Sequence, residues 1–194
     1  MRMVSVCELT KLRNRDKKSE AEFISHRSCR RAGCARIEWV ISGAKYVHTN
    51  LVARDWRELA RFYAEVFGCE PVPPQRDQQG PWLDAATGLN GARLRGMHLR
   101  LPGGGPDGPT LEIYSYDDMG VQPFSMPNDT GYGHLAFSVN DISAAVQDVV
   151  DHGGTLVGEI ATTTVAGVGE LEVIYVRDPE GNIIELQTWR TGLA

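Results

Sequence analysis

Two histidines and two glutamates occupy matching positions in two separate stretches of this 194-residue chain. His48 and His134 each come two residues after a tyrosine, and Glu112 and Glu185 each lie in a short apolar segment further along. Two imidazoles and two carboxylates suit a borderline divalent ion such as Zn, Ni, Co, Mn or Fe(II), and they leave coordination positions open for substrate or water. We therefore expect these four side chains to bind one divalent metal ion, provided that the fold makes the two stretches face one another.

The elements around these residues repeat almost position for position. Seven residues after each histidine comes an aspartate, Asp55 or Asp141, placed to cap the free N–H groups at the start of a helix. Apolar residues then recur at three- and four-residue spacing as far as Gly68 in the first stretch and Gly153 in the second, which predicts two amphipathic helices. Each half closes with an apolar strand that carries its glutamate. One module has thus been used twice.

The repeat predicts the organisation of the whole chain. Each module is predicted to have the order βαβββ, so the expected fold class is α+β with tandem βαβββ modules. The modules are predicted at residues 45–117 and 131–190, joined by a linker at 118–130. Residues 1–44 are expected to be a basic, poorly ordered N-terminal extension, because the first forty residues hold ten Lys or Arg and five acidic residues whereas the remainder holds ten and twenty.

The finer pattern predicts the individual strands and turns. In the first module, after the helix, we expect a proline-rich turn at 71–74, a short strand at 82–84 and a longer strand at 92–101. A glycine-rich loop at 102–109 and a last strand at 110–116 follow. In the second module we expect a strand ending at Val139 and a helix to about His152. Three strands should follow, at 155–157, 171–176 and 182–189, with a hairpin turn at 177–182 before the last of them.

Composition limits the classes of function. A hydrophobic content of 42% allows the chain to bury a core, and no apolar run approaches the roughly eighteen residues that a membrane span needs. The net charge of -5 gives no reason to expect a nucleic-acid partner. We therefore expect a cytoplasmic protein that acts on a small molecule. The four cysteines are few and unevenly spread, so neither a disulfide framework nor a zinc knuckle is expected.

Two segments resemble a known superfamily. They are similar to the usual sequence motifs of the vicinal oxygen chelate superfamily and read GYGHLAFSV, at 131–139, and VRDPEGNIIEL, at 176–186. Its members include glyoxalase I, methylmalonyl-CoA epimerase, extradiol dioxygenases, and the fosfomycin and bleomycin resistance proteins. The resemblance covers roughly residues 45–190 and implies that the tandem modules form a glyoxalase-like cleft.

Within that superfamily the chain is most similar to the branch with four protein ligands, glyoxalase I and methylmalonyl-CoA epimerase, because Glu112 fills the fourth ligand position. The resemblance implies His48, Glu112, His134 and Glu185 as ligands of one divalent ion (Ni, Zn, Co, Mn or Fe). It also implies a lyase or isomerase that stabilises an enediolate or enolate of a small oxygenated substrate on the metal and transfers a proton. Glu112 or Glu185 is then the catalytic base.

Three further side chains are candidates for contact with the substrate. Tyr114 and Tyr116 share a strand face with Glu112, and His98 alternates with apolar neighbours in the preceding strand. Two departures from the bacterial glyoxalase I pattern argue against glutathione. Val52 stands where that pattern has an arginine four residues after the first histidine, and Tyr116 stands where it has an asparagine.

Arginines recur along the strand predicted at 92–101, at Arg93, Arg95 and Arg100. They could meet an anionic substrate, although exposed strand arginines need no such purpose.

Two other functions stay open at this point. An extradiol-type Fe(II) dioxygenase would need Glu112 to point away from the metal, and a metal-free drug-binding resistance protein would use the paired modules as a cleft. The sequence also leaves open how the site is assembled. Duplicated modules permit a site within one chain or a site shared between the two chains of a homodimer.

Overall fold

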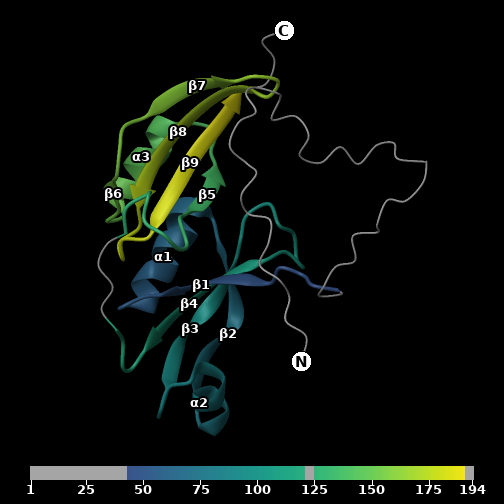
Figure 1. The fold of residues 1–194 in the computed structure, drawn as a ribbon, viewed down its shortest axis with the longest axis vertical. Coiled ribbons are helices and arrows are strands. Elements are labelled where there is room, and N and C mark those ends of the chain that lie inside the picture. The colour runs from purple at the N-terminus through teal and green to yellow at the C-terminus, as the bar shows by residue number, and fades with distance from the viewer. Residues whose placement is uncertain (1–42, 121–124, 191–194) are drawn as a thin grey trace, which may run out of the picture. The chain divides into compact units, whose positions relative to one another are not determined.

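The two predicted modules are built around two separate mixed sheets (Figure 1). The structure is a computed structural model, and it describes residues 43–120 and 125–190, which include a compact unit that begins at Lys45. The predicted basic extension therefore lies almost entirely outside the described residues, as does part of the predicted linker. None of the helices within the described ranges has the length and apolar content of a membrane-crossing helix. The α+β class predicted from the repeat is confirmed.

The first sheet has the strand order β1-β4-β3-β2. Its strands are β1 (His48–Val52), β2 (Glu70–Gln79), β3 (Arg93–Arg100) and β4 (Thr110–Tyr116), with β1 parallel to β4 and the other pairs antiparallel. Helix α1 (Trp56–Phe67) begins where the Asp55 carboxylate accepts hydrogen bonds from the backbone N–H groups of Arg57 and Glu58. It ends at Gly68, whose φ of 67° a residue with a side chain rarely adopts.

The second sheet has the strand order β5-β9-β8-β6, with β7 pairing on β8. Its strands are β5 (Leu135–Ser138), β6 (Thr155–Leu156), β7 (Ala161–Val165), β8 (Gly169–Arg177) and β9 (Ile183–Arg190). Helix α3 (Ile142–Asp151) is capped by Asp141, as predicted. Strand β5 runs parallel to β9, just as β1 runs parallel to β4. The glutamate-bearing strands β4 and β9 thus occupy equivalent places in the two sheets.

Three local predictions were wrong. Residues 71–74 are part of β2 rather than a turn. Prolines, which lack an N–H, are tolerated there because β2 is an edge strand and its ladder of hydrogen bonds to β3 is interrupted between Val72 and Arg76. Residues 82–84 lie in helix α2 (Pro81–Thr87), whose seven residues are too few to show a helical repeat. Strand β7 was missed because its residues are exposed except for Val165, which leaves no apolar alternation to read.

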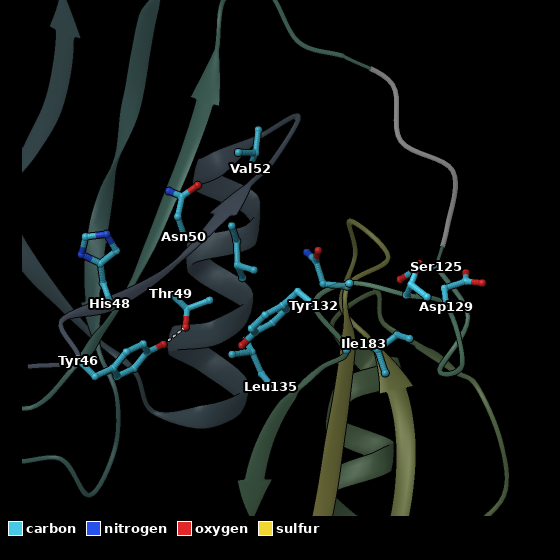
Figure 2. A pocket seen from close by; sticks show the side chains of 15 residues that line it. Tyr46, His48, Thr49, Asn50, Val52, Ser125, Asp129, Tyr132, Leu135 and Ile183 are labelled. Atoms are coloured by element: carbon cyan, nitrogen blue, oxygen red, sulfur yellow. Dashed lines mark hydrogen bonds between the residues drawn. The ribbon is translucent and has the colours of Figure 1, made fainter. Parts of the chain in front are cut away.

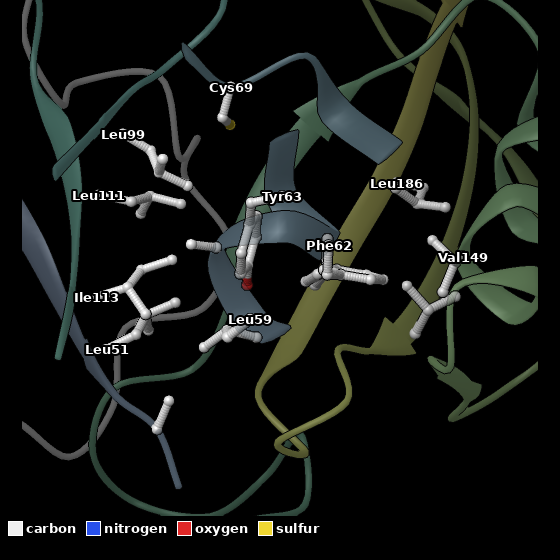
Figure 3. Close-up of a cluster of buried hydrophobic side chains, with 14 of the residues drawn as sticks. Leu51, Leu59, Phe62, Tyr63, Cys69, Leu99, Leu111, Ile113, Val149 and Leu186 are labelled. Carbon is white, nitrogen blue, oxygen red and sulfur yellow. The ribbon is translucent and has the colours of Figure 1, made fainter. Parts of the chain in front are cut away.

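Helix α1 connects the cores of the two modules. Its buried side chains Leu59, Phe62 and Tyr63 lie between residues of the first sheet and residues of the second module (Figure 3). On the next turn Phe67 stacks on Phe137 of β5, with 4.1 Å between the ring centroids. Burial of this continuous apolar cluster is the main stabilisation that holds the modules together.

A buried carboxylate adds a polar link between the modules. Asp178, at the turn between β8 and β9, accepts a 2.9 Å hydrogen bond from the Tyr63 hydroxyl of α1. It also accepts bonds from the backbone N–H groups of Glu180 and Asn182 and from the Asn182 side-chain amide. Burial raises the pKa of Asp178, and the hydrogen bonds from Asn182 and Tyr63 oppose part of that shift.

Glu180, two residues further along, accepts hydrogen bonds from the backbone N–H groups of Arg54 and Asp55 and from the Arg54 side chain. The β8–β9 turn is therefore tied to the start of α1 through Glu180 and to the second half of α1 through Asp178 and Tyr63.

The core packing also decides which face of each sheet stays open. Leu111 and Ile113 of β4 are fully buried in the cluster around α1, so Glu112 between them points to the opposite face. Ile184 and Leu186 of β9 are equally buried, and Glu185 points away from them in the same way.

Candidate functional site

The first pair of predicted ligands lies on the open face of the first sheet. Nε2 of His48 is 3.4 Å from Oε2 of Glu112, and the two side chains are 40% and 16% exposed. The partner residues come from neighbouring parallel strands, in which Asn50 lies opposite Glu112. The Asn50 side-chain amide donates a 3.1 Å hydrogen bond to the same Oε2 atom, which fixes the orientation of the carboxylate.

The second pair has nearly the same geometry. His134 directly precedes β5, and its Nε2 lies 3.5 Å from Oε2 of Glu185, with side-chain exposures of 37% and 16%. The Tyr175 hydroxyl of β8 donates a 2.7 Å hydrogen bond to that carboxylate oxygen. Each module therefore presents one half-exposed imidazole beside one oriented, largely covered carboxylate.

The strand register gives each glutamate a partner directly across the antiparallel ladder. His98 lies opposite Glu112, with Nε2 at 3.1 Å from Oε1, and Tyr175 lies opposite Glu185. His98 was predicted from the sequence as a pocket residue, whereas Tyr175 was missed. The signal was present in the repeat, since Tyr175 and His98 hold the same place in the two hairpins, but it becomes readable only once the register is known.

The structure does not bring the four predicted ligands together within one chain. His48 lies with Glu112, and His134 lies with Glu185, but no contact joins one pair to the other. In the described part of the chain, no three His, Cys, Asp or Glu side chains are grouped so that they could hold a metal ion. What each chain presents is two equivalent half-sites.

Electrostatics keep the flanking groups of these half-sites neutral. Burial, more than the opposing effect of Glu112, lowers the pKa of His98. Burial and then the Glu112 charge raise the pKa of Tyr114 to about 12, and its hydroxyl lies 3.3 Å from Nε2 of His98. The hydrogen bond to Glu185 raises the pKa of Tyr175. Both phenols therefore keep their protons at neutral pH and can donate hydrogen bonds.

The other predicted substrate contacts are placed on the same face. Tyr114 is buried against Leu83 of α2, and Tyr116 packs on that small cluster, so α2 covers this end of the open face. The three arginines that could have met an anionic substrate are instead neutralised: Arg93 pairs with Asp77, Arg95 with Asp117, and Arg100 with Glu70. Each of the three therefore has a carboxylate partner within the protein.

A cavity of about 790 Å³ lies beside β1 and contains one of the predicted ligands, His48 (Figure 2). Its lining runs from Tyr46 and Val52 across to Tyr132 and Ile183. Glu112, His134 and Glu185 are not part of this lining, so the cavity is not the four-residue site. Its exposed tyrosines instead give the neighbourhood of both histidines an aromatic surface.

Comparisons with known proteins show the family and the fold. Residues 45–186 match the family described as the Glyoxalase/Bleomycin resistance protein/Dioxygenase superfamily. A lactoylglutathione lyase of Salmonella typhimurium is 28% identical over 142 residues, which are 73% of this chain and 90% of that protein. Lactoylglutathione lyase GLX1 of Arabidopsis thaliana is 25% identical over 142 residues, which are 73% of this chain. The same match covers only 43% of the length of the plant protein. The crystal structure of a glyoxalase family protein from Bacillus cereus superimposes with a TM-score of 0.61 at 20% identity, covering 80% of this chain and 99% of that one, and supports the fold.

Proposed function

Because this chain belongs to the Glyoxalase/Bleomycin resistance protein/Dioxygenase superfamily, we propose that it is a metal-dependent enzyme of the isomerase or lyase type. In this proposal, His48 and Glu112 of one chain and His134 and Glu185 of a second copy hold one divalent ion. The substrate is a small oxygenated compound.

The observation that carries the proposal is the equality of the two histidine–glutamate pairs. Their nitrogen-to-oxygen distances are 3.4 and 3.5 Å, and their exposures match. Two ligand atoms that each lie about 2.1 Å from one ion are about 3.0 to 3.4 Å apart at octahedral or tetrahedral angles. Each pair thus has the donor types and the spacing of two adjacent ligands. The hydrogen bonds from Asn50 and Tyr175 supply the outer support that metal-binding carboxylates need.

A second copy is the natural source of the missing half. Two ligands from one side leave an ion largely open, and each chain carries two such halves. In a dimer with twofold symmetry, each first-module pair can meet the second-module pair of the partner, which completes two identical sites. Strands β1 and β5 are edge strands of their sheets, and Tyr46, Val52 and Tyr132 beside the histidines are exposed. Exposed apolar side chains beside strands that have an unpaired edge within the described residues favour contact with another chain.

The residues around the half-sites suit proton transfer next to a carbonyl. A divalent ion bound there would supply a Lewis acid that polarises a carbonyl oxygen. Glu112 and Glu185 are partly covered carboxylates within reach of such a substrate, so either can accept a proton from a carbon next to the carbonyl. Tyr114 keeps its hydroxyl proton and can donate a hydrogen bond to developing negative charge, whereas the Tyr175 proton is already donated to Glu185.

The curated relatives are named lactoylglutathione lyases, which makes that reaction the first to assay. Val52 and Tyr116 in the positions discussed above argue for a substrate other than a glutathione adduct.

Elemental analysis of purified, metal-reconstituted protein tests the proposal directly. We expect about one equivalent of Ni, Zn, Co or Mn per chain, and a strong loss of metal in Glu112→Ala. Glu159→Ala, which removes an exposed carboxylate from the second module, is the matched control and should keep the full equivalent. Iron retained in Glu112→Ala would instead indicate a dioxygenase. A chain that takes up no metal would be a small-molecule binding protein.

Tyr175→Phe should weaken metal binding without abolishing it. The variant loses the hydrogen bond that orients the Glu185 carboxylate, and loss of such an outer contact typically costs about tenfold or more in metal affinity. Competition against a chromogenic chelator measures the change. Tyr46→Phe is the control, because the Tyr46 hydroxyl contacts Thr49 and not a predicted ligand. Equal affinity of Tyr175→Phe and the parent would remove Tyr175 from this role.

A further inference from the structure

Arg76 of β2 is a half-buried cation on the same sheet face as Glu112. We propose that Arg76 binds a carboxylate group of the substrate, so that the substrate is a small carboxylate-bearing compound whose other end carries the oxygens that meet the metal. This inference rests on the proposed function for the metal end. It adds a substrate class and a residue that determines specificity.

The strand register places Arg76 on the open face. Arg76 lies directly opposite Gly96 of β3, and Gly96 lies directly opposite Tyr114 of β4. Residues that oppose one another across a ladder project to the same side of the sheet. Tyr114 is two residues from Glu112 and therefore shares its face. Arg76, Tyr114 and Glu112 accordingly belong to one surface.

Gly96 leaves room for this arrangement. A Cβ atom at position 96 would come within 2.2 Å of Cδ1 of Tyr114, so the tyrosine ring lies over the glycine, toward β2. Arg76 therefore lies across Gly96 from the tyrosine ring, on the sheet face that carries Glu112.

Arg76 differs from the other arginines of its sheet. Arg93, Arg95 and Arg100 each pair with a carboxylate, whereas no ion pair of Arg76 is found among the described residues. One of its guanidinium nitrogens donates a 2.6 Å hydrogen bond to the backbone oxygen of Pro74. A guanidinium group has five N–H donors, so most of its capacity remains for an anion. A half-covered cation without a counter-ion is costly, and a bound carboxylate removes that cost with two parallel hydrogen bonds.

The spacing limits the size of the substrate. Arg76 and Glu112 stand on strands separated by β3, which puts their backbones about 10 Å apart across the sheet. Both residues belong to the same open face of the sheet. A short-chain compound with vicinal oxygens at one end and a carboxylate at the other spans that interval.

Two probes that differ only at the far end test the proposal on the full-length, metal-loaded protein. Glutaric acid monohydroxamate carries a metal-chelating hydroxamate and a carboxylate, and its terminal amide carries a neutral carboxamide in place of the carboxylate. By calorimetry we expect the carboxylate probe to bind the parent about tenfold more tightly than the amide. Arg76→Gln should abolish this preference and leave the amide affinity unchanged, and Arg76→Lys should retain part of it. Arg93→Gln, which affects an ion-paired arginine, should retain all of it.

A metal-free measurement separates this inference from the proposed metal site. In the protein without metal, glutarate should shift the side-chain Nε resonance of Arg76 in the ¹⁵N spectrum, and glutaramide should not. If this shift occurs while neither hydroxamate binds the metal-loaded protein, the carboxylate site stands and the metal proposal fails. An unchanged Arg76 resonance, or a carboxylate preference that survives in Arg76→Gln, would overturn the role of Arg76.

Discussion

A heterodimer of His48→Ala and His134→Ala chains is expected to bind one metal ion, although each variant alone binds none. In each variant homodimer both shared sites lack one histidine. In the heterodimer one site receives both intact histidines, His48 from one chain and His134 from the other, and the second site lacks both. Co-expression with two different affinity tags isolates the heterodimer. Elemental analysis should then give half the metal content of the parent dimer.

A second heterodimer provides the matched control. It pairs a parent chain with a chain that carries both His48→Ala and His134→Ala, so it contains the same two substitutions distributed differently. Sites shared between chains are then both damaged, and no metal should bind. Sites formed within single chains would reverse the two results, with metal in the control and none in the first heterodimer. A protein that stays monomeric in the presence of metal would also contradict the shared site.

Asp178→Ala should cost the protein about 3 to 4 kcal/mol of its free energy of unfolding. The carboxylate is 2% exposed and accepts four hydrogen bonds, including the one from Tyr63. Alanine leaves these donors buried without acceptors and opens space between α1 and the β8–β9 turn. Urea denaturation followed by circular dichroism measures the loss as a lower midpoint with an unchanged slope.

Two comparisons sharpen that experiment. Asp178→Asn keeps one acceptor oxygen and nearly the same volume, so its loss should be smaller than that of alanine. Asp148→Ala changes an exposed aspartate of α3 and should stay within about 0.5 kcal/mol of the parent. If Asp178→Ala were as stable as Asp148→Ala, the buried carboxylate would have no part in joining the modules.

Local chemistry explains which elements could be predicted. Helices α1 and α3 were placed correctly because Asp55 and Asp141 cap them and apolar residues repeat at helical spacing along them. Strand β4 was placed to the residue at Thr110–Tyr116, since a loop rich in glycine and proline precedes it. Strand β2 and helix α2 were not, because the edge position that accepts prolines and the shortness of α2 are properties of the assembled fold.

By itself the sequence determined the duplicated module, the superfamily and the face of each strand on which Glu112 and Glu185 lie. A strand period of two residues fixes a face without reference to any other segment. Only the tertiary structure decided what each residue meets across that face. Cross-strand partners depend on the strand register, which joins segments far apart in the chain. Examples are His98 opposite Glu112, Tyr175 opposite Glu185, and Arg76, which faces Tyr114 across Gly96. The separation of the ligands into two half-sites likewise depends on how α1 packs the modules together, because packing of distant segments leaves no local periodicity in the sequence.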